Sequence, residues 1–259
     1  MRTSNPALNA NVFARERSFA SGETMTLQGT VNKTLVLLAL AFMTASWIWG
    51  KLMQPAPLLG GWESPVAQQQ ARVMPWVMGG MFGGLIAGFV TVFKRNIAGI
   101  TAPIYALCEG LVLGGVSAIF EMRYPGIVIQ AVALTFGTLF CLLMAYKSGM
   151  IRVTDNLRLG IVAATGAIAM VYFFSWILSF FGVPMTFLYG SGPVSIGFSL
   201  LVVGIAAFNL VLDFDFIEQG VSMGVPKYME WYGAFGLMVT LVWLYMEILR
   251  LLAKMRERR

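Results

Sequence analysis

Histidine is absent from the 259 residues of this chain. Its absence excludes zinc sites built on imidazole, catalytic pairs of serine or cysteine with histidine, and a histidine pH sensor. Any proton-linked chemistry must therefore use carboxylates. The chain also lacks a Gly-x-Ser-x-Gly motif and a paired catalytic dyad within its apolar stretches, so we expect neither enzymatic activity nor a bound cofactor.

Cysteine and charged residues are also scarce. The 2 cysteines, Cys108 and Cys141, lie inside apolar stretches, where we expect them to pack between helices as small buried residues rather than form a disulfide. Charged residues make up 12% of the chain, about half the fraction of a typical soluble domain, whereas hydrophobic residues make up 58%. A soluble globular domain is therefore excluded.

The apolar residues form blocks of about 20 residues, the length of an α-helix that crosses a bilayer. This pattern predicts an all-α integral membrane protein with seven transmembrane helices. The predicted spans are Val31–Gly50, Met74–Phe93, Ala102–Phe120, Gly126–Tyr146, Leu159–Phe181, Val194–Leu212 and Trp231–Leu252.

The flanking segments divide the chain into three predicted parts. Residues 1–30 are polar and lack the apolar core of a signal peptide, which predicts a disordered cytoplasmic tail. Residues 31–252 form the seven-helix membrane domain, and residues 253–259 form a basic C-terminal tail. The net charge of +6, placed beside the spans, predicts contact with anionic membrane lipids and not with nucleic acid. No motif identifies a protein partner.

Lysine and arginine predict the orientation of the chain, because basic residues gather on the cytoplasmic side of a membrane. Ten basic residues flank the spans on the side of the amino terminus, whereas the opposite loops contain only three, Lys51, Arg72 and Arg123. We therefore expect a cytoplasmic amino terminus. Seven crossings place the carboxyl terminus outside, although "RLLAKMRERR" is the most basic segment. Either the rule fails at this end or the seventh segment does not cross fully.

Glycines recur four residues apart in two of the predicted spans. Gly79/Gly83 and Gly80/Gly84/Gly88 lie in the second span, and Gly110/Gly114 lie in the third. This spacing allows helix backbones to approach closely in lipid. We favour close packing over a permeation path lined by glycine.

Carboxylates within or beside the spans are the candidate functional groups, because a buried charge is costly without partners or water. Glu109 lies in the third span with no basic residue within a helical turn. Asp213, Asp215 and Glu218 close the sixth apolar run in "NLVLDFDFIEQG". Glu230 precedes a predicted interfacial aromatic pair, Trp231 and Tyr232, and Glu247 is spaced to form an ordinary interfacial pair with Arg250.

Helix geometry separates the acidic residues of the sixth span into two faces. Asn209 and Asp213 are four residues apart and share a face, which we expect to point into the bundle. Asp215 and Glu218 lie on the other face, towards cytoplasmic water or a cavity mouth; alternatively, all three carboxylates are solvated at a helix end. The segment lacks the spacing of an EF-hand, so Asp213, Asp215 and Glu218 predict at most a weak attraction for calcium.

Several segments together resemble the transmembrane Bax inhibitor motif family. They are "EGLVLGG" in the third span, "LDFDFIEQG" at the end of the sixth, and "WYGAFGLMVTLVWLYMEILRLL" at the seventh. The amino-terminal "RTSNPAL" looks like the start of one bacterial branch, which implies a bacterial inner membrane.

The resemblance implies a seven-helix fold whose last helix is central. It also implies a pH-sensitive calcium leak gated by two aspartates that share a proton, one on the sixth helix and one on the seventh. Asp213 matches the first position, whereas the second falls at or near Thr240, and no carboxylate lies between Glu230 and Glu247. If a paired latch exists, Asp215, Glu109 or Glu230 must supply its second carboxylate.

We therefore expect a pH-sensitive calcium leak channel. Asp213, removed from bulk water, holds a proton that keeps the path shut, and loss of the proton admits water and a cation. Glu109, Asn209 and Asp215 are its expected gating or proton-sensing partners. The alternatives are a proton-coupled transporter of a small solute, for which we find no internal repeat, and a membrane scaffold without transport activity.

Overall fold

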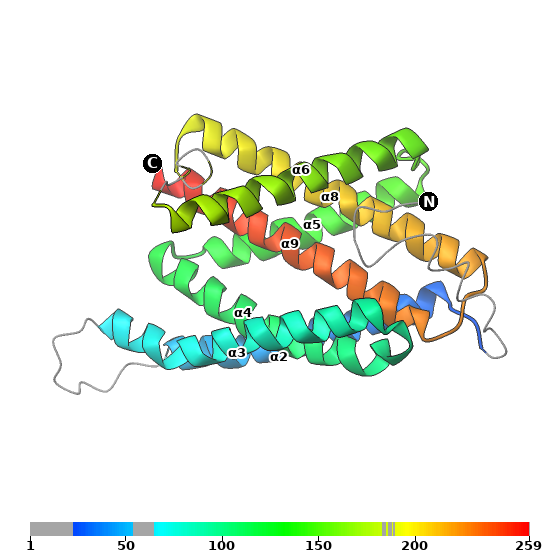
Figure 1. Cartoon of the computed structure of the whole chain (residues 1–259), viewed down its shortest axis with the longest axis horizontal. Helices are drawn as coiled ribbons and strands as arrows, with labels where there is room; N and C mark the ends of the chain where they lie inside the picture. The colour runs from blue at the N-terminus through cyan, green and yellow to red at the C-terminus, as the bar shows by residue number, and fades with distance from the viewer. Residues whose placement is uncertain (1–22, 54–64, 183–184, 186–187, 189, 259) are drawn as a thin grey trace. The chain divides into compact units, whose positions relative to one another are not determined.

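The computed structural model describes residues 23–53, 65–182, 185, 188 and 190–258, and these residues form long helices (Figure 1). Seven of the described helices are long and apolar enough to cross a membrane. They are α2 (Leu27–Met53), α3 (Pro65–Phe93), α4 (Ala98–Arg123), α5 (Ile127–Lys147), α6 (Asp155–Phe180), α8 (Pro193–Ser222) and α9 (Met229–Glu257). A short 3-10 turn, η2 (Arg95–Ile97), precedes α4. The predicted fold class and all seven predicted spans are confirmed.

The sixth helix is longer than its predicted apolar run. The apolar run stops at Leu212, but α8 continues to Ser222. Asp213, Asp215 and Glu218 are therefore part of the helix and do not follow it. An apolar run ends at its first charged residue. The backbone hydrogen bonds of a helix continue through charged residues when other side chains form hydrogen bonds or ion pairs with them.

The predicted boundaries of the two tails also need correction. Residues 27–30 belong to α2, and α9 continues through residues 253–257 to Glu257. The segment before α2 is tied down, because the Met25 backbone N–H donates to the Val225 carbonyl at 2.7 Å and Lys227 pairs with Glu23. Residues 1–22, with the remainder of the predicted tail, lie outside the described residues.

The described contacts divide the chain into two compact units. Among the described residues, the first contains those of 23–27, 129–227 and 236–258, and thus nearly all of α5 with α6, α8 and most of α9. The second contains residues 28–128 and 228–235, and thus α2, α3, α4 and the start of α9. The last helix contributes to both units.

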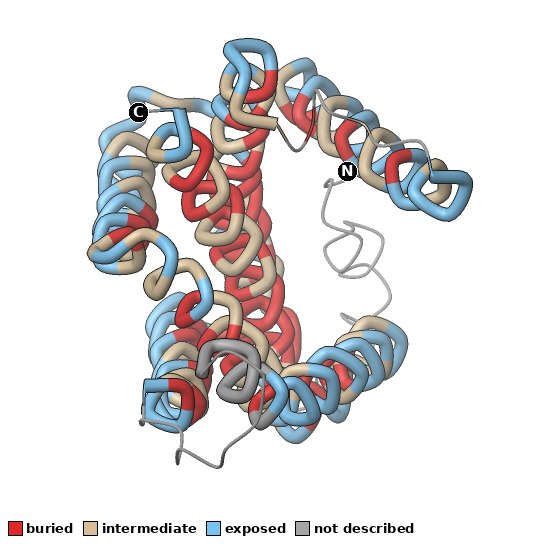
Figure 2. The backbone as a smooth tube through the Cα atoms, turned by 90° about the vertical axis from the view of Figure 1, so that its left-hand side faces the viewer, coloured by how far each residue is buried: buried red, intermediate tan, exposed pale blue. Residues whose placement is uncertain are grey.

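The last helix is the most buried of the seven (Figure 2). Buried residues make up 56% of its most apolar stretch, against 39% for α8 and 33% or less for the other helices. A helix that faces lipid would expose most of such a stretch, so α9 is an interior helix, as the resemblance implied.

The carboxyl-terminal end of α9 lies at the same end of the first unit as the connection between α6 and α8. The Lys254 ammonium donates to the Leu188 carbonyl in that connection. The seventh helix is long and apolar enough to cross a membrane, and the choice between the two alternatives for its carboxyl-terminal end stays open. Arg250 and Lys254 both make internal contacts, so part of the positive charge of the last segment acts within the protein.

Close helix packing through glycine is confirmed in the second unit. A Cβ atom on Gly110 would lie 2.2 Å from the Ala41 carbonyl oxygen of α2, and one on Gly80 of α3 would lie 2.6 Å from the Cys108 carbonyl oxygen of α4. Gly79, in contrast, has no atom within 4 Å of such a Cβ. Both cysteines are free thiols; Cys108 is half-buried, but Cys141 is exposed, so its predicted burial between helices was wrong.

Candidate functional site

Asn209 and Asp213 are two buried polar residues of α8. The two residues are 3% and 1% exposed, respectively. The Asn209 side-chain amide donates to the Thr165 hydroxyl of α6 and to the Ile205 carbonyl, each at 2.9 Å. The shared face predicted from the four-residue spacing is therefore turned into the protein.

The Asp213 side chain is buried on α8. Its neighbours Leu212 and Phe214 are themselves buried. Because α8 continues for more than two turns beyond Asp213, the carboxylate is not in the last turn, where it would oppose the helix dipole. The cost of a charge at this position comes from desolvation instead, and this cost falls when the group binds a proton.

Asp215 and Glu218 form the second acidic face of α8, and side chains of two other helices bind them. Asp215 accepts from the Arg158 guanidinium of α6 at 2.5 Å and from the Gln219 amide at 2.6 Å. Glu218, which is exposed, accepts from the Tyr146 hydroxyl of α5 at 2.5 Å. This face therefore connects α5, α6 and α8 at one end of the first unit.

Arg158 is the principal site residue that the sequence did not reveal. Its side chain is 8% exposed, and it bonds to Asp215 while lying 3.6 Å from the exposed carboxylate of Asp155. In the sequence Arg158 counts as a basic loop residue before the fifth apolar run. The available signal was Thr154, which caps α6 by accepting from the Leu157 N–H, because this cap places Arg158 inside the helix.

The three carboxylates of α8 do not gather into a metal centre. Within the described part of the chain, no group of three or more Asp, Glu or Cys side chains could hold a metal ion. Helix geometry explains this, because successive residues turn by about 100° and Asp213 and Asp215 therefore point apart. The weak calcium attraction predicted for Asp213, Asp215 and Glu218 would have to arise from fewer than three carboxylates together.

Thr240 is the position on α9 at or near which the resemblance implies a second aspartate. It is buried, and its hydroxyl donates to the Gly236 carbonyl, one turn earlier, at 3.3 Å. Further along the same helix, the Lys254 ammonium donates to the Ser199 hydroxyl of α8 at 2.8 Å and joins α9 to α8.

The other two candidate acids lie in the second unit, and each has a partner there. The half-buried Glu109 accepts from the Tyr105 hydroxyl, one turn earlier on α4. Glu230 is 1% exposed and pairs with the Lys33 ammonium of α2, which also lies 5.5 Å from the centre of the Trp231 ring. Tyr232 is fully buried, so its predicted place in an interfacial aromatic belt was wrong.

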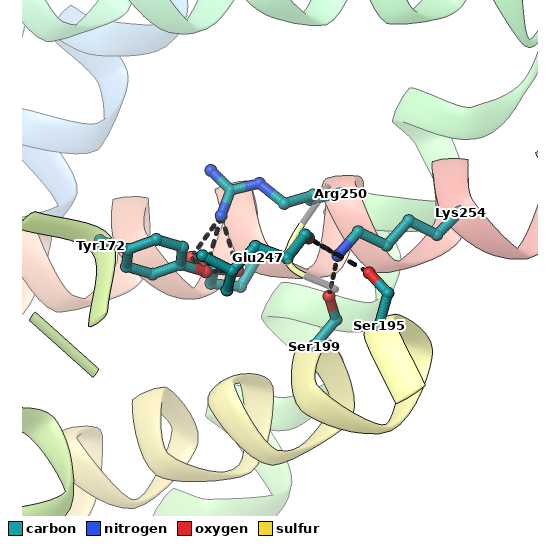
Figure 3. Close-up of polar contacts among 7 residues, drawn as sticks. Tyr172, Ser195, Ser199, Glu247, Arg250 and Lys254 are labelled. Atoms are coloured by element: carbon teal, nitrogen blue, oxygen red, sulfur yellow. Dashed lines mark hydrogen bonds and ion pairs between the residues drawn. The ribbon is translucent and has the colours of Figure 1, made fainter. Parts of the chain in front are cut away.

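Glu247 and Arg250 form the predicted pair. Their side chains approach to 3.1 Å, and the Tyr172 hydroxyl of α6 donates to Glu247 at 3.1 Å while accepting from Arg250 at 2.8 Å (Figure 3). The Glu247 side chain is only 3% exposed, whereas that of Arg250 is 33% exposed, so the pair has one buried and one accessible member. A seven-residue spacing puts Thr240, Glu247 and Lys254 on one buried face of α9.

Comparison with known proteins identifies the family. The family model described as Bax inhibitor 1 like matches residues 5–257, which is nearly the whole chain. The chain belongs to the Bax inhibitor 1 like family. It is thus a multi-pass membrane protein of this family, with α8 and α9 as its sixth and seventh spans. Comparisons with curated proteins and with solved structures gave no match.

Proposed function

We propose that the protein is a pH-sensitive calcium leak channel in which Asp213 is the gating carboxylate. The observation that carries this proposal is the burial of Asp213, which is 1% exposed within a membrane-spanning helix. An ionisable residue in such a position is expensive to keep and marks an ion or proton pathway by default. Membership of the Bax inhibitor 1 like family also supports this proposal, but it does not specify the transported ion.

The gate works through the protonation state of a single carboxylate. A protonated Asp213 is neutral and is therefore less costly than the charged form at this buried position. Loss of the proton places a negative charge there, which draws in water and offers oxygen atoms to a cation. Thr240, the position on α9 at or near which the resemblance implies a second aspartate, carries a hydroxyl and no charge, so the proposed gate does not require repulsion between two paired carboxylates.

The neighbouring contacts supply the rigid frame against which the gate moves. The Asn209–Thr165 hydrogen bond and the Arg158–Asp215 ion pair both join α8 to α6, on either side of Asp213 along the chain. Glu109, which is bonded to Tyr105, is a second proton-sensing candidate in the other unit. We further propose that the protein lies in a bacterial inner membrane with its amino terminus in the cytoplasm, and that it is not an enzyme.

The test is a flux measurement on the purified protein in liposomes. Calcium entry should exceed that of empty liposomes, require no added solute, and increase as the pH is raised from acidic to alkaline values. Proton uptake that depends on a particular small solute would identify a coupled transporter instead. Calcium entry equal to that of empty liposomes at every pH would leave a membrane scaffold as the remaining function.

A further inference from the structure

The basic residues beside the spans fall into two groups in the structure. Those of the first group are engaged within the protein: Lys33, Arg158, Lys227 and Arg250 pair with carboxylates, and Lys51 and Arg123 lie over aromatic rings. Lys147 and Arg152 belong to the second group. Both are exposed, and in the part of the chain that the structure describes neither pairs with a carboxylate or an aromatic ring.

Lys147 and Arg152, the loop cations, belong to the short connection between α5 and α6, which we call the α5–α6 loop (residues 147–153). Helix α5 ends at Lys147. The Ile151 backbone N–H donates back to the Ala145 carbonyl at 3.2 Å, so the loop folds over the last turn of α5. Both loop cations are therefore held at the same end of this helix.

An exposed methionine lies between the two loop cations. Met150 is 82% exposed, although its side chain is large and apolar. The membrane-spanning helices on either side also expose apolar side chains next to the loop, Met144 of α5 and Leu159 of α6. Such side chains face lipid in a membrane-spanning helix. The lipid around α5 and α6 is therefore the apolar environment that Met150 can enter.

The acids near the loop bind other partners. Asp215 pairs with Arg158, and Asp155 lies 3.6 Å from the same guanidinium. Glu218 accepts from the Tyr146 hydroxyl. The loop itself contains no aspartate or glutamate. The charges of the two loop cations consequently remain available to an anion from outside the protein, and a basic residue beside a bilayer attracts anionic headgroups.

We propose that the α5–α6 loop is a binding site for an anionic phospholipid of the bilayer, with Lys147 and Arg152 at its phosphate and Met150 among its acyl chains. An arginine can bind a phosphate through two parallel hydrogen bonds, and a lysine adds a second positive charge. A zwitterionic phospholipid fits less well, because its own ammonium is repelled by both loop cations. This site is independent of the proposed function, since it needs neither a gate nor a transported ion.

The experiment titrates the purified protein in a neutral detergent with phosphatidylglycerol or phosphatidylcholine and counts bound lipid by native mass spectrometry. We expect phosphatidylglycerol to bind more tightly. Lys147→Gln combined with Arg152→Gln should weaken its binding by about 25-fold, about fivefold for each positive charge. Lys147→Arg combined with Arg152→Lys keeps both charges and should bind as the wild type does.

The matched control removes two basic residues that the protein itself engages. Lys51→Gln combined with Arg123→Gln changes the net charge by the same amount, and we expect its affinity for phosphatidylglycerol to equal that of the wild type. Met150→Ser tests the apolar part of the site and should weaken binding by about tenfold, whereas Met150→Leu should not. All these side chains are exposed, and size-exclusion profiles establish that the variants are folded.

The outcomes identify the occupant of the loop. Equal binding of the two lipids, or unchanged phosphatidylglycerol binding in the folded Lys147→Gln, Arg152→Gln protein, would overturn the site. An equal loss in the Lys51→Gln, Arg123→Gln control would also overturn it, because the attraction would then follow net charge alone. Displacement of the lipid by equimolar glycerophosphoglycerol would assign the loop to a soluble phosphate ester, and displacement by an equimolar glutamate-rich peptide would assign it to an acidic protein segment. Either result would contradict a phospholipid site.

Discussion

Replacement of Gly110 by alanine should separate two helices of the second unit. An alanine Cβ would lie 2.0 Å from the Thr44 hydroxyl oxygen and 2.2 Å from the Ala41 carbonyl oxygen. The hydroxyl can rotate away, but the carbonyl belongs to the backbone of α2. The two helices must therefore move apart by about 1 Å before ordinary contact distances return.

The expected cost follows from three contributions. Overpacking of this kind costs about 1–3 kcal/mol. The hydrogen bond from Thr44 to the Leu107 carbonyl, 2.9 Å long, joins the same two helices and is lost when they separate, at a further ~0.6 kcal/mol. The higher helix propensity of alanine offsets up to about 1 kcal/mol. The variant should therefore be destabilised by about 2 kcal/mol.

The assay is unfolding in mixed micelles of a mild and a denaturing detergent, followed by circular dichroism. Gly137→Ala is the matched control, because no atom lies within 4 Å of its added Cβ, and we expect it to be neutral or slightly stabilising. A Gly110→Ala protein as stable as wild type would refute the close approach of α2 and α4. Equal losses in both variants would show that the effect does not arise from this contact.

The buried ion pairs give two further predictions. Arg158→Met should cost about 3 kcal/mol, because it leaves the Asp215 carboxylate without its cation in a site that is 18% exposed, whereas Asp215→Asn should cost about 1 kcal/mol, because asparagine still accepts a hydrogen bond. Equal losses in the two variants, or strict additivity in the double variant, would contradict this asymmetry. Lys33→Met should likewise lower the unfolding temperature, and adding Glu230→Gln should recover most of the loss; a double variant no more stable than Lys33→Met would show that the charge of Glu230 is not the cause.

The number, order and approximate bounds of the helices could be predicted from the sequence because a bilayer requires long apolar runs. The end of α8 could not, since the run stops at Leu212 while the helix continues to Ser222. Asp213 could be assigned to the interior because its four-residue spacing from Asn209 defines a face. That inference needs only the geometry of one helix.

The partners of the buried charges could not be predicted in the same way. Arg158 and Lys254 look like a loop residue and a tail residue in the sequence, yet their partners lie on other segments, Asp215 on α8 and Leu188 before it. Such pairs depend on the register between helices, which no pattern within one span contains. The interior position of α9 came from family resemblance, because its composition resembles that of the other spans.

The central claim concerns the proton on Asp213, and the pH profile of calcium flux through Asp213→Asn in liposomes tests it most directly. Asp155→Asn, at a carboxylate that is 97% exposed, is the matched control and should keep the wild-type profile. The account predicts that flux through Asp213→Asn no longer changes with pH, because the asparagine amide can neither bind nor release the gating proton. A folded Asp213→Asn protein with the pH profile of the wild type would contradict it.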